Sequence, residues 1–149
     1  MTTPSKTIHS YEPRKGHGLA HDPIASIVGP RPIGWISSRS EDGQLNLAPY
    51  SFFNLFNYKP PIVAFSSVGF KDTIRNVQAT REFVVNLATR ALAEQVNLSS
   101  AAVSSDVNEF DLTGLSPVKS QIVAAPRVGE SPVNLECKVL QIQQLAGLD

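Results

Sequence analysis

A segment near the middle of the chain carries residue types that could bind an anion. Ser66 and Ser67 supply two hydroxyl groups after an apolar run, and Lys71 and Thr73 follow a glycine turn at the expected start of a helix. Free N–H groups at a helix N-terminus and the positive end of the helix dipole favour a negative charge. A lysine adds a charge-assisted contact. Serine and threonine also cap helices, so these residues alone leave helix capping open beside a phosphate site.

A second segment mixes rings with small polar groups. Residues 48–54 read Ala-Pro-Tyr-Ser-Phe-Phe-Asn and follow an expected strand. A planar heteroaromatic ligand needs apolar walls against its face and hydrogen-bonding groups at its edge. Phenylalanines are more often plain core residues, and Arg31 and Trp35 have the same ambiguity.

Other kinds of chemistry find little support. His17 and His21 are four residues apart, but the neighbouring glycines and proline argue against a helix that would bring them together for a metal. Asp106, Glu109 and Asp111 fall in an expected loop, where carboxylates are more often solvated surface charges. The phosphate-loop, dinucleotide-binding, nucleophile-elbow and zinc-protease motifs do not occur in the sequence.

The composition is that of an ordinary globular domain. The 149 residues are 42% hydrophobic and 17% charged, with 13 basic and 13 acidic side chains. A zero net charge argues against nucleic acid as a partner, because phosphate backbones are bound by excess Lys and Arg. The single cysteine, Cys137, excludes an internal disulfide. With no run near the roughly 20 apolar residues of a membrane helix, a cytoplasmic protein without membrane contact is expected.

Hydrophobic periodicity predicts a mainly β fold with short helices, either a barrel or a sandwich. The Asp42-Gly43 pair predicts a hairpin turn between two of the strands. Residues 1–22 are expected to form an extended arm, and residues 106–117 a loop. Strands are expected over 24–28, 33–38, 45–51, 62–67, 82–87 and 133–142, and helices from Lys71 or Asp72 to Thr80 and over 89–96, with Thr89 as the N-cap.

Five motifs, taken in order, closely resemble the flavin reductase-like family. The resemblance runs from about Tyr11 to about Leu145 and implies an FMN-binding split β-barrel. The motifs lie at Pro30–Ser40, Asn46–Asn54, Phe65–Ser67 with Lys71–Thr73, Glu82–Leu87 and Ser131–Cys137.

The resemblance also implies a homodimer with FMN in a groove between the subunits. The phosphate would be held by Ser66, Ser67, Lys71, Asp72 and Thr73. The isoalloxazine ring would lie along Ser51, Phe52, Phe53 and Asn54, with Trp35, Ser37 and Ser38 lining the ribityl or ring side and Arg31 near the pocket.

The activity implied is hydride transfer from NADH or NADPH to N5 of the flavin, which requires no acid–base dyad. A partner monooxygenase or another acceptor would take the electrons. Residues 23–149 would form the split-barrel domain and would lack the family's C-terminal portion, leaving residues 139–145 at an unpaired sheet edge, with 141–145 as an aggregation or pairing site. Two alternatives stay open: an FMN-binding electron carrier or inactive FMN-binding protein without turnover, and a purely structural β-barrel.

Overall fold

The computed structural model describes residues 8–145, and these form two compact units that divide after Arg31. The first unit contains the 3₁₀ turn η1 (Pro13–Lys15) and the short helix α1 (Pro23–Ile27). Asp22 caps α1 by accepting from the Ile24 N–H over 2.9 Å. The strand expected over 24–28 is therefore wrong, because an aspartate followed by proline at the first helical position starts a helix here.

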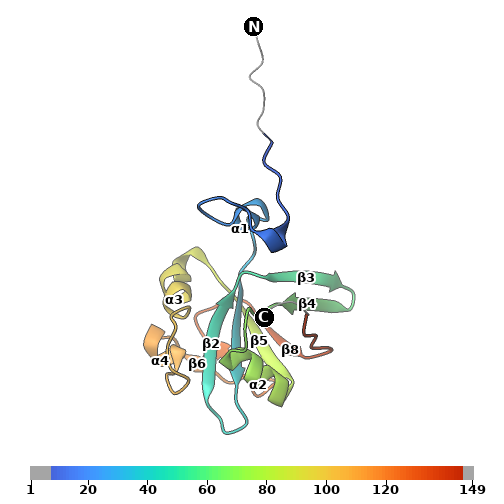
Figure 1. The fold of residues 1–149 in the computed structure, drawn as a ribbon. Coiled ribbons are helices and arrows are strands. Elements are labelled where there is room, and N and C mark those ends of the chain that lie inside the picture. The colour runs from blue at the N-terminus through green and yellow to red at the C-terminus, as the bar shows by residue number, and fades with distance from the viewer. Residues whose placement is uncertain (1–7, 146–149) are drawn as a thin grey trace. The chain divides into compact units, whose positions relative to one another are not determined.

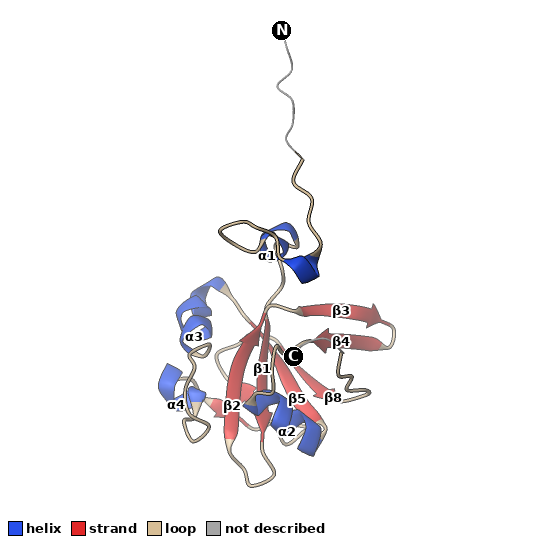
Figure 2. Ribbon diagram, viewed as in Figure 1, coloured by secondary structure: helices blue, strands red, loops and turns tan. Residues whose placement is uncertain are grey.

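The second unit is built on a four-stranded antiparallel sheet with strand order β2-β1-β5-β8 (Figures 1 and 2). The Asp42-Gly43 turn joins the first two strands, with Gly43 at φ 98° and the Ser40 N–H bonded to the Gln44 carbonyl over 2.9 Å. The predicted hairpin is confirmed. The strands are β1 (Gly34–Arg39), β2 (Leu45–Tyr50), β5 (Glu82–Leu87) and β8 (Asn134–Lys138).

Two small hairpins complete the β structure. The strands β3 (Phe53–Tyr58) and β4 (Pro61–Phe65) pair with each other and project to one side of the main sheet (Figure 1). The strands β6 (Pro117–Val118) and β7 (Arg127–Val128) form the other pair. The helical segments are α2 (Asp72–Thr80), η2 (Arg90–Leu92), α3 (Ala93–Leu98) and α4 (Glu109–Thr113).

Both faces of the main sheet are buried. Trp35 and Ile36 are adjacent in β1 and therefore point to opposite faces, yet both have 0% exposure. Trp35 packs with Phe110 of α4 on one face, and Ile36 packs with Val77 of α2 on the other. The helices α2 and α4 therefore cover opposite faces, which fixes the start of α2 against one face of the sheet.

The larger differences from the sequence-based expectation lie in the last strand and in two helical segments. The last strand ends at Lys138, so residues 139–142 are not part of it. The segment expected as a loop over 106–117 contains α4, which Asn108 caps by accepting from the Phe110 N–H over 3.0 Å. The helix expected over 89–96 is a 3₁₀ turn followed by α3, and Thr89 occupies the N-cap position without a side-chain hydrogen bond.

Over residues 8–145, the structure has no helix long and apolar enough to cross a membrane.

Candidate functional site

The turn between β4 and α2 brings the two candidate segments of the sequence together. The Ser66 N–H donates to the Phe52 carbonyl over 2.8 Å, and Phe53 pairs with Phe65 in the β3–β4 register. The Ser67 hydroxyl donates to the Gly69 carbonyl over 3.0 Å. Residues 52–53 and 65–66 of the two segments are thus neighbours.

The start of α2 is open to an anion. Lys71 is the N-cap residue, is exposed, and makes no side-chain capping bond to the helix. Because the first N–H groups of a helix have no partner within it, these donors are left to another group. Asp72 places a carboxylate in the first turn, but Arg75 neutralises it through an ion pair of 2.6 Å. Lys71 then adds a positive charge to the helix dipole.

A buried polar layer lies behind this turn. Thr73 is 1% exposed, and its hydroxyl accepts a hydrogen bond from the Asn46 side-chain amide over 2.8 Å. The hydroxyl of Tyr50 is buried and makes no well-formed hydrogen bond to any of the described residues. Burial raises the pKa of Tyr50, while the facing hydroxyls of Thr73 and Ser67 act in the opposite direction. The ring of Tyr50 packs against Phe65, with centroids 4.9 Å apart.

The segment expected to lie along the flavin ring is partly exposed. Phe52 is 51% exposed, and Ser51 and Phe53 are half-buried. Phe53 packs so closely on Gly34 that a Cβ there would lie 2.5 Å from its ring. The exposed Asn54 accepts from the Leu55 N–H through its side-chain oxygen over 2.8 Å.

The three β1 side chains expected at the cofactor are fully buried. Trp35 donates its indole N–H to the Ser99 hydroxyl over 2.9 Å, and Ser37 donates to the Pro126 carbonyl over 2.5 Å. Ser38 accepts from the Asn76 amide over 3.2 Å. These bonds give all three residues a structural role, and their contact with a cofactor stays a prediction.

Arg31 belongs to the first unit. Its guanidinium donates to the carbonyls of Ala25 and Val28 over 2.8 and 2.6 Å, at the end of α1. Its expected place near the cofactor also stays a prediction.

Three buried polar residues have roles that the sequence did not indicate. Glu109, expected among the surface charges, is only 7% exposed and accepts from the Leu47 N–H over 3.1 Å. That expectation is wrong because α4 packs on β2. Burial raises the pKa of Glu109. The other two, Asn46 and Tyr50, lie on the α2-facing side of β2, which the strand's alternation could have indicated.

Comparisons with known proteins match this architecture. The family model described as the flavin reductase like domain matches residues 29–148. The chain belongs to the flavin reductase-like family. An uncharacterised protein of Aquifex aeolicus is 43% identical over 121 residues, which cover 78% of this chain and 62% of that protein. The chain spans 62% of the length of this relative and 54% of the length of an uncharacterised protein of Methanothermobacter thermautotrophicus.

Solved structures share the fold. A Pseudomonas fluorescens 2-nitrobenzoate 2-nitroreductase is 33% identical, with a TM-score of 0.71 over 77% of this chain and 56% of that one. Nitrilotriacetate monooxygenase component B of Bacillus cereus is 27% identical, with a TM-score of 0.82. The match covers 96% of this chain and 73% of that one. A Shewanella frigidimarina protein described as a putative flavin reductase with a split barrel domain is 27% identical, with a TM-score of 0.78. The match covers 83% of this chain and 62% of that one.

These matches confirm the predicted family and the predicted split β-barrel fold. The residues of this flavin reductase-like domain also fit the phosphate end of FMN. The uncapped α2 start offers N–H donors, Lys71 offers charge, and Ser66 and Ser67 offer hydroxyls. The buried Tyr50 hydroxyl, which lacks a well-formed hydrogen bond among the described residues, is a further sign of a polar site at this turn.

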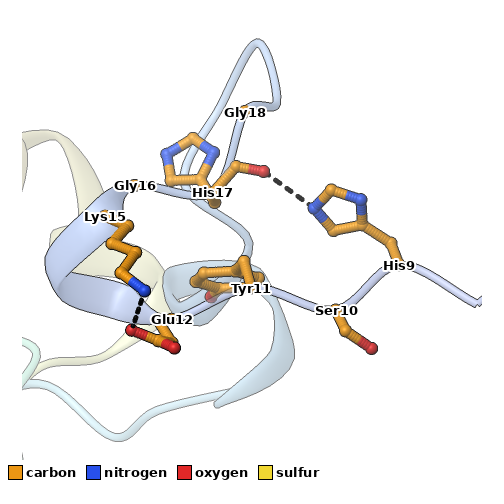
Figure 3. Close-up of a pocket in the computed structure, with 8 residues that line it drawn as sticks. All are labelled: His9, Ser10, Tyr11, Glu12, Lys15, Gly16, His17 and Gly18. Carbon is orange, nitrogen blue, oxygen red and sulfur yellow. Dashed lines mark hydrogen bonds and ion pairs between the residues drawn. The ribbon is translucent and has the colours of Figure 1, made fainter.

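The first unit contains an open hollow of about 620 Å³, lined by residues of the arm (Figure 3). His9 Nε2 lies 2.7 Å from the His17 carbonyl, and Lys15 pairs with Glu12 at 2.9 Å. His17 Nδ1 accepts from the Leu19 N–H over 3.0 Å. The arm's polar groups therefore bond mainly to each other, and residues 8–145 hold no cluster of three metal-ligating side chains. The lining residues are His9, Ser10, Tyr11, Glu12, Lys15, Gly16, His17 and Gly18.

Proposed function

We propose that this domain binds FMN and acts as an NAD(P)H-dependent flavin oxidoreductase. The observation that carries the proposal is the α2 N-terminus, which has no side-chain cap and begins at the exposed Lys71 beside the Ser66–Ser67 turn. Membership of the flavin reductase-like family supports the same reading.

Each part of the site has a role in this proposal. Lys71 and the first N–H groups of α2 hold the phosphate, and the hydroxyls of Ser66 and Ser67 complete its hydrogen bonds. The half-exposed Phe52 and the segment around it supply an apolar wall for the ring. When bound, FMN would supply the redox chemistry as the hydride acceptor. The chain's own task is to orient the cofactor and shield it from water.

The proposal includes a homodimer, and exposed apolar side chains on the second unit support it. Leu55 and Phe56 of β3 are 56% and 73% exposed, and Phe70 of the following turn is 65% exposed. Large apolar side chains left exposed in this way are typical of an interface. A second copy of the chain would cover them close to the proposed cofactor site.

Oxidation of NADH and of NADPH, followed by absorbance with the FMN-saturated full chain, tests the activity. The proposal predicts turnover that depends on added FMN, with electrons passing to a separate acceptor such as a monooxygenase partner. Saturable FMN binding without any nicotinamide oxidation would instead support an FMN-binding carrier. A chain that neither binds FMN nor oxidises NADH or NADPH would contradict both.

A further inference from the structure

Four polar side chains form a row from the core to the surface at the start of α2. Asn46 donates its amide N–H to Thr73 Oγ1 over 2.8 Å, and the hydroxyls of Thr73 and Ser67 both face the Tyr50 hydroxyl. Asn46, Thr73 and Tyr50 are 7%, 1% and 7% exposed. Ser67 is half-buried and stands at the outer end of the row.

The inner end of this row sets the direction in which its hydrogen bonds can be donated. An amide N–H can only donate, whereas a hydroxyl can accept one hydrogen bond and donate another. Because Thr73 accepts from Asn46, its own proton is free to point onward to Tyr50. The same logic lets Tyr50 accept from Thr73 and donate onward to Ser67.

The hydrogen bonds along this row are incomplete in the structure. The Tyr50 hydroxyl faces Thr73 and Ser67 but makes no well-formed hydrogen bond within the described part of the chain. The Ser67 hydroxyl donates back to the Gly69 carbonyl over 3.0 Å instead of outward. A buried hydroxyl without a partner is unfavourable, so a small movement that connects Tyr50 to Ser67 would be stabilised.

We propose that Tyr50 is a positioning residue that acts through Ser67 to select phosphorylated flavin. When the FMN phosphate binds at the start of α2, the Ser67 hydroxyl turns from Gly69 to the phosphate, and Tyr50 donates to the Ser67 oxygen. Each hydroxyl in the completed row polarises the next, which strengthens the outermost bond to the anion. This inference rests on the proposed FMN binding and adds a residue that distinguishes FMN from riboflavin.

The test compares FMN and riboflavin affinities of the full chain with those of Tyr50→Phe, by flavin fluorescence. The substitution keeps the ring that packs on Phe65, and thermal unfolding checks that the variant folds. The expected result is a roughly three- to tenfold weaker FMN affinity, with riboflavin affinity unchanged. Tyr58→Phe, which removes the hydroxyl of a tyrosine that is 82% exposed, is the matched control and should change neither.

The double variant tests whether Tyr50 acts through Ser67. If it does, Tyr50→Phe should add no loss of FMN affinity to Ser67→Ala, because the two residues form one unit. Additive losses, unchanged FMN affinity, or an equal loss for riboflavin would overturn the positioning role and leave the proposed function standing. A wild-type chain that binds no FMN would overturn both.

Discussion

Replacing Lys71 with alanine should weaken FMN binding without unfolding the domain. A hydrogen bond to a charged group contributes about 1.5–3 kcal/mol, which corresponds to roughly a 10- to 150-fold change in Kd. Lys71 is exposed, and solvent screening lowers such contributions. The expected loss is therefore at the lower end, about tenfold.

Titration of the full chain with FMN, followed by fluorescence quenching at low and high salt, measures this effect. The difference between wild type and Lys71→Ala should shrink at high salt, because exposed charges are screened. Lys119→Ala is the matched control, since it removes an exposed lysine from the segment between β6 and β7. Unchanged FMN affinity in Lys71→Ala would refute the assignment of the phosphate to α2. An equal loss of riboflavin affinity would show that Lys71 does not act on the phosphate.

Three further predictions concern the site and its support. Arg75→Ala should weaken FMN affinity by about two- to fivefold, because it leaves the Asp72 carboxylate unbalanced in the first turn of α2; a gain in affinity in the same titration would contradict this. Asn86→Ala should lower the free energy of unfolding by about 3 kcal/mol in a urea titration, because the buried Asn86 amide bonds four separate groups; a loss near zero would show that the network is dispensable. Burial raises the pKa of Glu109, so its contribution to stability is largest below its ordinary pKa and is lost as pH rises through the raised value. Glu109→Gln should remove this decline in stability with rising pH, because the amide carries no titrating proton and its oxygen can still accept from the Leu47 N–H. Thermal melts at several pH values measure the effect. A decline that is steeper in the variant than in the wild type would refute the reasoning.

Much of the second unit could be predicted because local signals and the fold agree. Asp42-Gly43 specifies a hairpin turn through its backbone preferences, and the hairpin is present. The apolar and polar spacing after Lys71 predicts a helix, and α2 begins at Asp72. Such features depend on a few neighbouring residues, so the sequence determines them directly.

The missed features depend on what packs over a residue. The run from Ile24 to Val28 is β-prone by composition, but Asp22 and Pro23 before it start a helix. Nothing local to Glu109 shows that it lies against the edge of β2, because that contact joins residues 62 positions apart. Periodicity indicates which face a side chain occupies, but not which element covers that face.

The buried part of the candidate site was missed for the same reason. Asn46 lies in an expected strand and Tyr50 in the ring-bearing segment 48–54, but neither had a role of its own, because their importance comes from Thr73, which approaches from α2. The exposed part was visible in the sequence, because hydroxyls and a lysine around a turn carry their chemistry on the surface.

The most direct test of the central claim is a titration of the full chain with FMN, together with the mass of the complex in solution. The account predicts saturable binding of one FMN per chain in a dimer, with riboflavin bound more weakly because it lacks the phosphate. Equal affinity for FMN and riboflavin would contradict the phosphate site at the start of α2. The absence of saturable FMN binding would contradict the proposed function as a whole.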